Sequence, residues 1–146
     1  MEKIASFQKD HDKLQPGLYA QTDKNLITTF DLRFKKPNAG DYITPKALHT
    51  IEHLLATVLR NSEKKDDIVY FGPMGCRTGF YLLTVRLCFE EVLALLKESI
   101  KKALALEEVP GSKREECGNY LEHDIAAAKE ELRNYLLILD GVEAHS

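Results

Sequence analysis

The sequence has no tryptophan and only three cysteines, and it lacks any stretch of about 18 or more consecutive apolar residues. The missing apolar stretch excludes a transmembrane helix. Residues 1–13 are polar and contain no apolar segment of the kind found in secretory signals. An odd number of cysteines without paired spacing fits a reducing compartment better than a disulfide framework. These absences predict a cytoplasmic protein that does not contact a membrane.

A strong charge imbalance is missing too. Twenty Lys and Arg residues against 23 Asp and Glu residues give a formal net charge of −3. This net charge gives no electrostatic case for binding to nucleic acid or to an anionic membrane. Hydrophobic residues make up 44% of the 146 residues, which is enough for one core without disulfide bonds. We therefore predict a single domain over residues 1–146, with no nucleic-acid partner.

Hydrophobic periodicity predicts an α+β fold. Residues 26–34 alternate, with Phe30 and Leu32 on one side and Asp31 and Arg33 on the other, as in a half-buried strand. Further strands are expected at 68–71 and 80–89. Because the strands come early and the helices late, we expect an antiparallel sheet of about four strands, packed on one face by three to four α-helices.

The helices are predicted from their end signals. Thr44 followed by Pro45 is typical of an N-cap and a first helical residue, and this helix should run to about residue 61. A second helix is expected over residues 90–107. Asn119 with Glu122 three residues later resembles a capping box for a third helix, which Gly141 would end.

A metal-binding motif lies in the first predicted helix. His49 and His53 are four residues apart, so both imidazoles lie on one helix face and can reach one ion. Glu52 lies on nearly the same face, where a carboxylate can act on a bound molecule without being a ligand. The order H-x-x-E-H is that of the inverted zincins.

Two histidines do not complete a metal site, so a third ligand must come from elsewhere. Cys117 stands before the third predicted helix, and its thiolate would give a His₂Cys set with an open fourth position, as in catalytic sites. Cys76 is an equally good candidate by sequence alone, whereas Cys88 lies in an apolar segment and is expected to be a small buried core residue. The remaining candidates are the acidic residues and His11, His123 and His145.

Two further residues are candidates for chemistry. Cys76 lies in a loop with three glycines, where a thiol can be accessible and can transfer protons, although it fits an ordinary loop cysteine equally well. Arg33 is interpreted either as half of a surface ion pair with Asp31 or as an anchor for a substrate carboxylate. His11 and Ser6 belong to a polar N-terminal arm that, by sequence alone, is expected to be solvated.

Taken together, five motifs in one order resemble the S-ribosylhomocysteine lyase family, also called LuxS, which produces the precursor of autoinducer-2. The resemblance covers about residues 5–140. The motifs are Ser6-Phe7 with Asp10-His11, Phe30 to Phe34 with Pro37-Asn38, His49 to Leu54, Pro73 to Cys76 with Thr78-Gly79, and Cys117-Gly118.

The resemblance implies a homodimer with an α+β fold and active sites at the subunit interface. It implies one divalent metal per subunit, natively Fe(II) and replaceable by Zn(II) or Co(II). His49, His53 and Cys117 match the metal ligands of the family, and Glu52 and Cys76 match its two acid–base residues. The positions that hold the substrate are matched by Ser6, His11 and Arg33, with Ser6 and His11 expected to come from the partner subunit.

The family reaction splits S-ribosylhomocysteine into homocysteine and 4,5-dihydroxy-2,3-pentanedione through successive enolisations and a β-elimination. Two departures from the family pattern affect substrate contacts: Tyr70 replaces an acidic residue, and Lys36 replaces a glutamine. Without the resemblance, the motif would also fit an inverted-zincin metallopeptidase that uses Glu52 to activate water. It would fit a non-catalytic, metal-stabilised interaction domain with four protein ligands as well.

Overall fold

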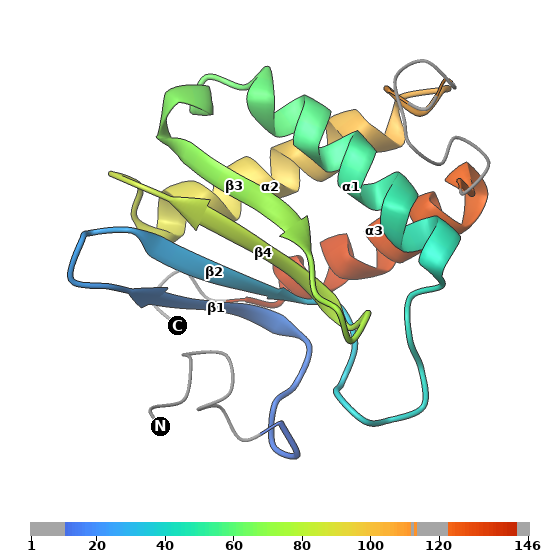
Figure 1. Ribbon diagram of the computed structural model, residues 1–146, viewed down its shortest axis with the longest axis horizontal. Helices are drawn as coiled ribbons and strands as arrows, with labels where there is room; N and C mark the ends of the chain where they lie inside the picture. The colour runs from blue at the N-terminus through green and yellow to red at the C-terminus, as the bar shows by residue number, and fades with distance from the viewer. Residues whose placement is uncertain (1–10, 112, 114–122, 143–146) are drawn as a thin grey trace.

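The computed structural model describes residues 11–111, 113 and 123–142, and it has two layers (Figure 1). One layer is a four-stranded sheet of order β1-β2-β4-β3 in which all neighbours are antiparallel. The other layer is formed by the helices, which cover one face of the sheet. The predicted antiparallel α+β architecture is therefore confirmed. The strands are β1 Gly17–Thr22, β2 Thr28–Arg33, β3 Ile68–Pro73 and β4 Gly79–Thr84.

The first helix begins where the sequence predicts. The side chain of Thr44 accepts a hydrogen bond from the backbone N–H of Ala47 at 3.3 Å, Pro45 is the first helical residue and Asn61 is the C-cap. Gly141 likewise ends the last helix, as expected. Each helix has one apolar face, which packs on the sheet and on the other helices. The helices are α1 Pro45–Arg60, the short 3-10 helix η2 Lys65–Asp67, α2 Phe89–Leu104 and α3 Ile125–Asp140.

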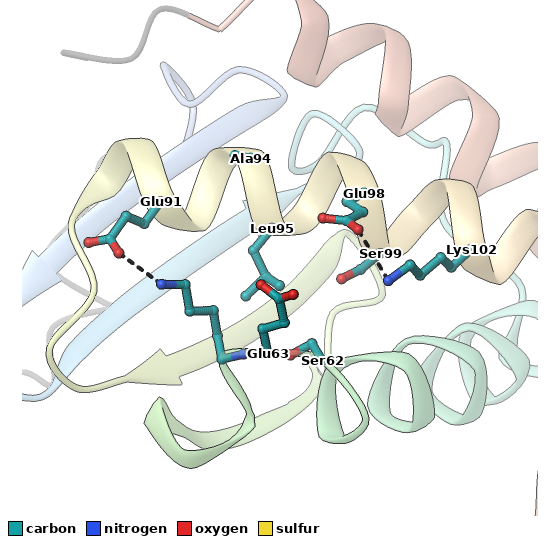
Figure 2. A pocket seen from close by; sticks show the side chains of 9 residues that line it. Ser62, Glu63, Glu91, Ala94, Leu95, Glu98, Ser99 and Lys102 are labelled. Atoms are coloured by element: carbon teal, nitrogen blue, oxygen red, sulfur yellow. Dashed lines mark hydrogen bonds and ion pairs between the residues drawn. The ribbon is translucent and has the colours of Figure 1, made fainter.

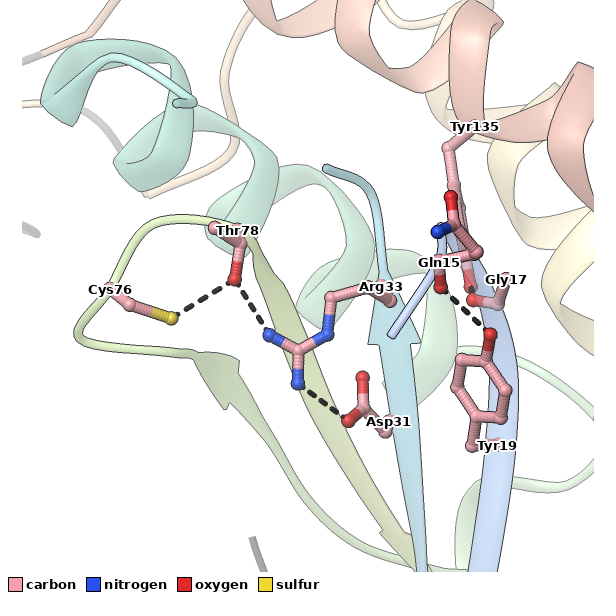
Figure 3. Close-up of polar contacts among 8 residues, drawn as sticks. All are labelled: Gln15, Gly17, Tyr19, Asp31, Arg33, Cys76, Thr78 and Tyr135. Atoms are coloured by element: carbon pink, nitrogen blue, oxygen red, sulfur yellow. Dashed lines mark hydrogen bonds and ion pairs between the residues drawn. The ribbon is translucent and has the colours of Figure 1, made fainter. Parts of the chain in front are cut away.

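The core lies between the sheet and the helices and is continued on α3 by Tyr135. This ring is fully buried and stacks on Phe34, with 4.0 Å between the ring centroids. Its hydroxyl donates a hydrogen bond to the carbonyl oxygen of Gly17 at 2.9 Å, which fixes α3 against β1 (Figure 3). Burial, helped by the nearby charge of Asp31, raises the pKa of Tyr135 well above its ordinary value.

Two predicted boundaries are wrong. The last strand ends at Thr84 rather than near residue 89, because Arg86 adopts a left-handed backbone with φ of +61° and turns the chain. The third helix begins at Ile125, where the side chain of Asp124 accepts a hydrogen bond from the N–H of Ala127 at 3.0 Å. The predicted capping residues, Asn119 and Glu122, lie outside the described residues.

The prediction for Cys88 is wrong as well. Cys88 is exposed rather than buried, and it is the N-cap of α2. Its backbone N–H donates a hydrogen bond to Oε1 of Glu91 at 3.1 Å. That hydrogen bond, together with one from the Cys88 side chain, holds the pKa of Glu91 below its usual value. The apolar neighbours of Cys88 enter the core, but the thiol itself does not.

Strands β2 and β4 approach each other very closely at Gly79. A Cβ atom at this position would lie 2.1 Å from the carbonyl oxygen of Leu32, so only glycine fits. The end of β2, which carries Arg33, is thereby held next to the loop that follows β3. Within the part of the chain that the structure describes, every helix is too short or too polar to span a bilayer.

Candidate active site

Three histidines form a cluster beside the first turns of α1. His49 and His53 lie one turn apart on α1, with 3.0 Å between their Nε2 atoms. His123, two residues before α3, stacks on His49 with 4.3 Å between the ring centroids. One ring nitrogen from each histidine lies within 4.8 Å of the other two. The predicted sharing of one helix face by His49 and His53 is confirmed, and the group has the geometry of a candidate metal site.

The hydrogen bond of His53 to the backbone prepares this ring for a metal. Its Nδ1 lies 2.8 Å from the carbonyl oxygen of Pro110. Because a carbonyl only accepts, Nδ1 carries the hydrogen, and the lone pair of the neutral ring is on Nε2, towards His49. Gly111 packs against the same ring, since a Cβ atom there would lie 3.2 Å from Nδ1 of His53. The chain after α2 therefore sets both the tautomer and the position of His53.

His123 is held by a hydrogen bond as well: its Nδ1 lies 3.0 Å from Oγ1 of Thr50. The Thr50 hydroxyl donates its single proton to the carbonyl oxygen of Lys46 at 2.9 Å. It also accepts a hydrogen bond from the N–H of Asp124 at 2.8 Å. Nδ1 of His123 is therefore the donor to Thr50, which puts the lone pair of that ring on Nε2. Two imidazoles with lone pairs on Nε2 fit a divalent metal ion.

A second group of predicted residues meets in a cavity of about 320 Å³ at the end of β2. His11, Arg33 and Cys76 line this cavity together with Thr78 and Tyr81. The guanidinium of Arg33 donates to Asp31 and to the hydroxyl of Thr78, both at 2.7 Å (Figure 3). The fold thus brings three residues that the sequence singles out to one cavity, although they are far apart along the chain.

Arg33 is not part of a surface ion pair. The residue is 1% exposed, and so is its partner Asp31, so the interpretation as a solvated pair is wrong. The prediction of a half-buried strand is wrong for the same reason, because both faces of β2 are covered at this end. Nε of Arg33 is buried and has no hydrogen-bond partner among the described residues. A buried guanidinium with an unused N–H can bind an anionic or polar group that enters the cavity.

The loop of Cys76 connects β3 to β4 and is tightly hydrogen-bonded. The N–H of Met74 donates to the carbonyl oxygen of Gly79 at 2.9 Å, and the N–H of Arg77 donates back to Met74 at 3.0 Å. Arg77 adopts a left-handed backbone with φ of +60°. Its carbonyl oxygen accepts from the N–H of Ile43, and its guanidinium donates to the Ile43 carbonyl. These hydrogen bonds hold the loop in one conformation, and Cys76 is exposed on it.

The remaining predicted residues lie as follows. Glu52 is half-buried on α1, one residue before His53. Ser6 and Cys117 lie outside the described residues, so the roles expected of them stay predictions. His11, which is expected from the family pattern to reach the site of a partner subunit, lies at the cavity of its own chain. Tyr70, one of the departures from the family pattern, is 51% exposed on β3.

The contacts of two residues in these groups cannot be predicted from the sequence pattern. Thr78 stands two residues after Cys76, which is a local hint, but its contact with Arg33 spans 45 residues. His123 is only one of several candidate ligands by sequence. It directly precedes Asp124, the N-cap of α3, a position that the wrong helix start obscures.

Another cavity, of about 270 Å³, lies between the end of α1 and α2 (Figure 2). Four of its five charged side chains form two ion pairs: Lys64 lies 3.2 Å from Glu91, and Lys102 lies 3.1 Å from Glu98. These exposed pairs contribute little to binding or stability, and we assign no site to this cavity.

Comparison with known proteins identifies the family. The family model described as S-Ribosylhomocysteinase (LuxS) matches residues 4–143. The chain belongs to the LuxS family. Relatives named S-ribosylhomocysteine lyase cover nearly its whole length. The chain is 45% identical to the Borreliella afzelii protein, with 98% of this chain and 96% of that relative covered. It is 43% identical to the Porphyromonas gingivalis protein, with 93% and 90% covered.

A third relative, from Desulfotalea psychrophila, is 44% identical, with 97% of this chain and 94% of the relative covered. LuxS membership confirms the resemblance drawn from the sequence motifs. It also gives the two groups of residues a common context, since His49 and His53 on α1 and Cys76 in the β3–β4 loop all fall inside the matched region.

Proposed function

We propose that this protein cleaves the thioether bond of S-ribosylhomocysteine to give homocysteine and 4,5-dihydroxy-2,3-pentanedione. The observation that carries the proposal is the family match over residues 4–143. The relatives bear the name S-ribosylhomocysteine lyase, and the two groups of residues described above suit this chemistry. The reaction needs no redox partner, because the atoms of the substrate are fully accounted for in the two products.

The metal site is proposed to contain His49, His53 and Cys117, following the family pattern. His49 and His53 lie in suitable positions, and His123 is the second candidate for the third ligand because of its place in the cluster. We propose Fe(II) as the native metal, with Zn(II) or Co(II) able to replace it. A divalent metal held there would supply Lewis-acid stabilisation of negative charge on the sugar oxygens. A fourth position left open would admit the substrate.

Glu52 and Cys76 are proposed to move the protons. The sugar carbonyl must migrate along the chain, and each move takes a proton from one carbon and returns it to the next. The final proton removal, at the carbon next to the one that bears sulfur, pushes an electron pair into a new C=C bond and expels the homocysteine thiolate. Transfers at different carbons need groups at different places. Glu52 lies on the metal-bearing helix and Cys76 on the β3–β4 loop.

The cavity lined by Arg33 and His11 is proposed to hold the polar part of the substrate, together with Ser6. The guanidinium of Arg33 already donates to Asp31 and Thr78, so a substrate group would be bound by its remaining N–H groups. The high cost of burying an arginine with an unused N–H favours a polar ligand at this place.

The protein is further proposed to be a homodimer with active sites at the interface. Phe71 and Leu82 face the core, so their strand neighbours Tyr70, Tyr81 and Leu83 lie on the opposite face of the sheet, on the neighbouring strands β3 and β4. Tyr70 is 51% exposed, and the other two are half-buried. An aromatic sheet surface of this kind is typical of a face that a second copy covers. The cavity lining includes neither His49 nor His53, which supports a site completed by two chains.

The test is release of free thiol from S-ribosylhomocysteine by anaerobically purified, metal-replete protein, followed with a thiol-reactive dye. We expect turnover that disappears on chelation and returns when Fe(II), Co(II) or Zn(II) is added back. Circular dichroism in parallel should show that the chelated protein keeps most of its fold. No thiol release from the replete protein would overturn the proposal, and complete unfolding on chelation would instead indicate a structural metal.

A further inference from the structure

The hydroxyl of Thr78 joins Arg33 to Cys76. Oγ1 of Thr78 lies 2.7 Å from Nη1 of Arg33 and 3.0 Å from Sγ of Cys76 (Figure 3). Arg33 is in turn paired with Asp31 at 2.7 Å. The figure shows these four side chains in a row, from the carboxylate on β2 to the thiol on the β3–β4 loop. Cys76 is the only exposed member of the row, so the row ends at the sulfur.

The chemistry of the groups fixes the direction of the hydrogen bonds. A guanidinium has no acceptor, so Arg33 donates and Oγ1 of Thr78 accepts. A thiolate has no proton to donate, so when Cys76 is anionic the single proton of the Thr78 hydroxyl is donated to Sγ. An O–H that already accepts from a cation is a stronger donor than an isolated hydroxyl. The row therefore places a polarised donor within hydrogen-bond distance of Sγ.

Thr78 itself is held firmly. The residue is 1% exposed, and its carbonyl oxygen accepts hydrogen bonds from the N–H groups of Phe34 and Lys35, each at 2.9 Å. Gly79, the next residue, packs directly on the backbone of Leu32. The hydroxyl is consequently fixed relative to the end of β2, whereas the side chain of Cys76 is exposed.

We propose that Thr78 is the positioning residue for Cys76: it holds the sulfur at the cavity and donates a hydrogen bond to its anionic form. This inference rests on the proposed function, because it assigns Thr78 a part in the proton transfers of Cys76. Thr78 does not itself exchange protons with the substrate. It acts through Cys76, and the charge of Arg33 reaches the sulfur through it.

The test compares Thr78→Val, which keeps the shape and removes the hydroxyl, with Thr78→Ser, which keeps the hydroxyl. The first readout is the rate at which iodoacetamide alkylates Cys76 at pH 7, followed by mass spectrometry of the peptide that carries it. A hydrogen bond to a charged group is stronger than one between neutral groups, so we expect alkylation about tenfold slower or more in Thr78→Val. Thr78→Ser should react at nearly the rate of the unmodified protein.

The second readout is turnover of S-ribosylhomocysteine. We expect Thr78→Val to lower kcat by about 10–100-fold with little change in KM or metal content, and Thr78→Ser to restore kcat. Thr78→Ala provides a second variant without the hydroxyl in case the valine variant folds poorly, and it should behave like Thr78→Val. Alkylation of a folded Thr78→Val or Thr78→Ala protein at the unmodified rate would overturn the proposal. Alkylation needs no substrate, so this result is independent of whether the proposed lyase activity exists.

Discussion

Nε2 of His53 lies 3.0 Å from Nε2 of His49, although the hydrogen bond of His53 to Pro110 puts the lone pair of that ring on the same Nε2. Two nitrogen atoms at this distance need a proton or a cation between them. Without a cation between the rings, His49 must therefore donate to His53. For both Nε2 atoms to bind one metal ion, the proton of His49 would have to leave its Nε2, so metal binding by this pair of rings is coupled to proton movement.

The first prediction decides the third metal ligand. Cys117→Ala and His123→Asn each remove one candidate, and we expect Cys117→Ala to lose the metal and His123→Asn to keep most of it. The measurement is metal content per chain, with the sulfur-to-metal charge-transfer absorption of the Co(II)-loaded protein as a second readout. His53→Ala is the positive control and should lose the metal. Full occupancy in Cys117→Ala, together with loss in His123→Asn, would establish the three-histidine set instead.

The second prediction concerns the proton-transfer groups. Glu52→Gln and Cys76→Ala should each lower kcat by about 10²–10⁴-fold while the metal content stays unchanged, because neither side chain is a proposed ligand. Cys76→Ser should also be nearly inactive, since a hydroxyl is a much weaker acid than a thiol. Cys88→Ala is the matched control and should turn over normally, although its helix loses a cap. Normal turnover in metal-replete Cys76→Ala would leave Glu52 as the only base.

The third prediction tests how two chains share a site. If the Cys76 cavity of one chain works with the metal cluster of its partner, then mixing inactive Cys76→Ala chains with inactive His53→Ala chains should restore activity. Every mixed dimer would contain one intact site, so each should show up to half of the activity of an unmodified dimer. The sample is prepared by mixing equal amounts of the two variants, unfolding them, and refolding them together. Mixtures that stay inactive would show that each site is built within one chain.

Mixing His11→Ala with Cys76→Ala tests the N-terminal arm separately. The family pattern expects His11 to serve the partner, which predicts recovery of activity, whereas the structure places His11 at the cavity of its own chain. Recovery would mean that the arm crosses to the partner in solution. Absence of recovery, in a mixture that does recover with His53→Ala, would assign His11 to its own chain.

The fourth prediction concerns stability at alkaline pH. Burial raises the pKa of Tyr135, so in the folded protein this hydroxyl stays protonated above its ordinary value of 10.0. The unfolded chain then binds fewer protons than the folded chain, and the free energy of unfolding falls as pH rises above about 10. Tyr135→Phe should lose about 1 kcal/mol at pH 8, from the hydrogen bond to Gly17, but should decline less steeply above pH 10. Urea denaturation at several pH values measures both effects. If the free energy of unfolding fell equally steeply above pH 10 in Tyr135→Phe and in the unmodified protein, Tyr135 would not be the cause of the decline.

The elements that can be predicted well from the sequence are those with strong local signals. Thr44 and Pro45 mark the start of α1 through hydrogen bonds within a few residues, so no tertiary information is needed. Strand β1 could not be predicted, because Gly17–Thr22 has a weak alternation and is held mainly by pairing with β2. The prediction for Cys88 fails because an apolar segment gives no indication of the left-handed turn at Arg86.

In the candidate site, too, the features that can be predicted are those encoded by nearby residues. His49 and His53 are related by one helical turn, so their proximity can be predicted from spacing alone. His123 is brought to them by a hydrogen bond to Thr50 across 73 residues, which no local pattern encodes. The burial of Arg33 is also unpredictable, because it depends on what covers the end of β2 and not on the strand itself.

The loop between β3 and β4 has consequences for how this protein can change over time. Surface loops usually accept extra residues, but here Met74 is hydrogen-bonded to Gly79 and Thr78 is hydrogen-bonded to the chain after β2. One added residue would break at least one of these backbone hydrogen bonds and would move the thiol of Cys76 away from the cavity. An insertion in this loop is therefore expected to lower activity more than a substitution at one of its exposed positions. A designer who grafts the loop onto another hairpin must transfer the neighbouring strand with it.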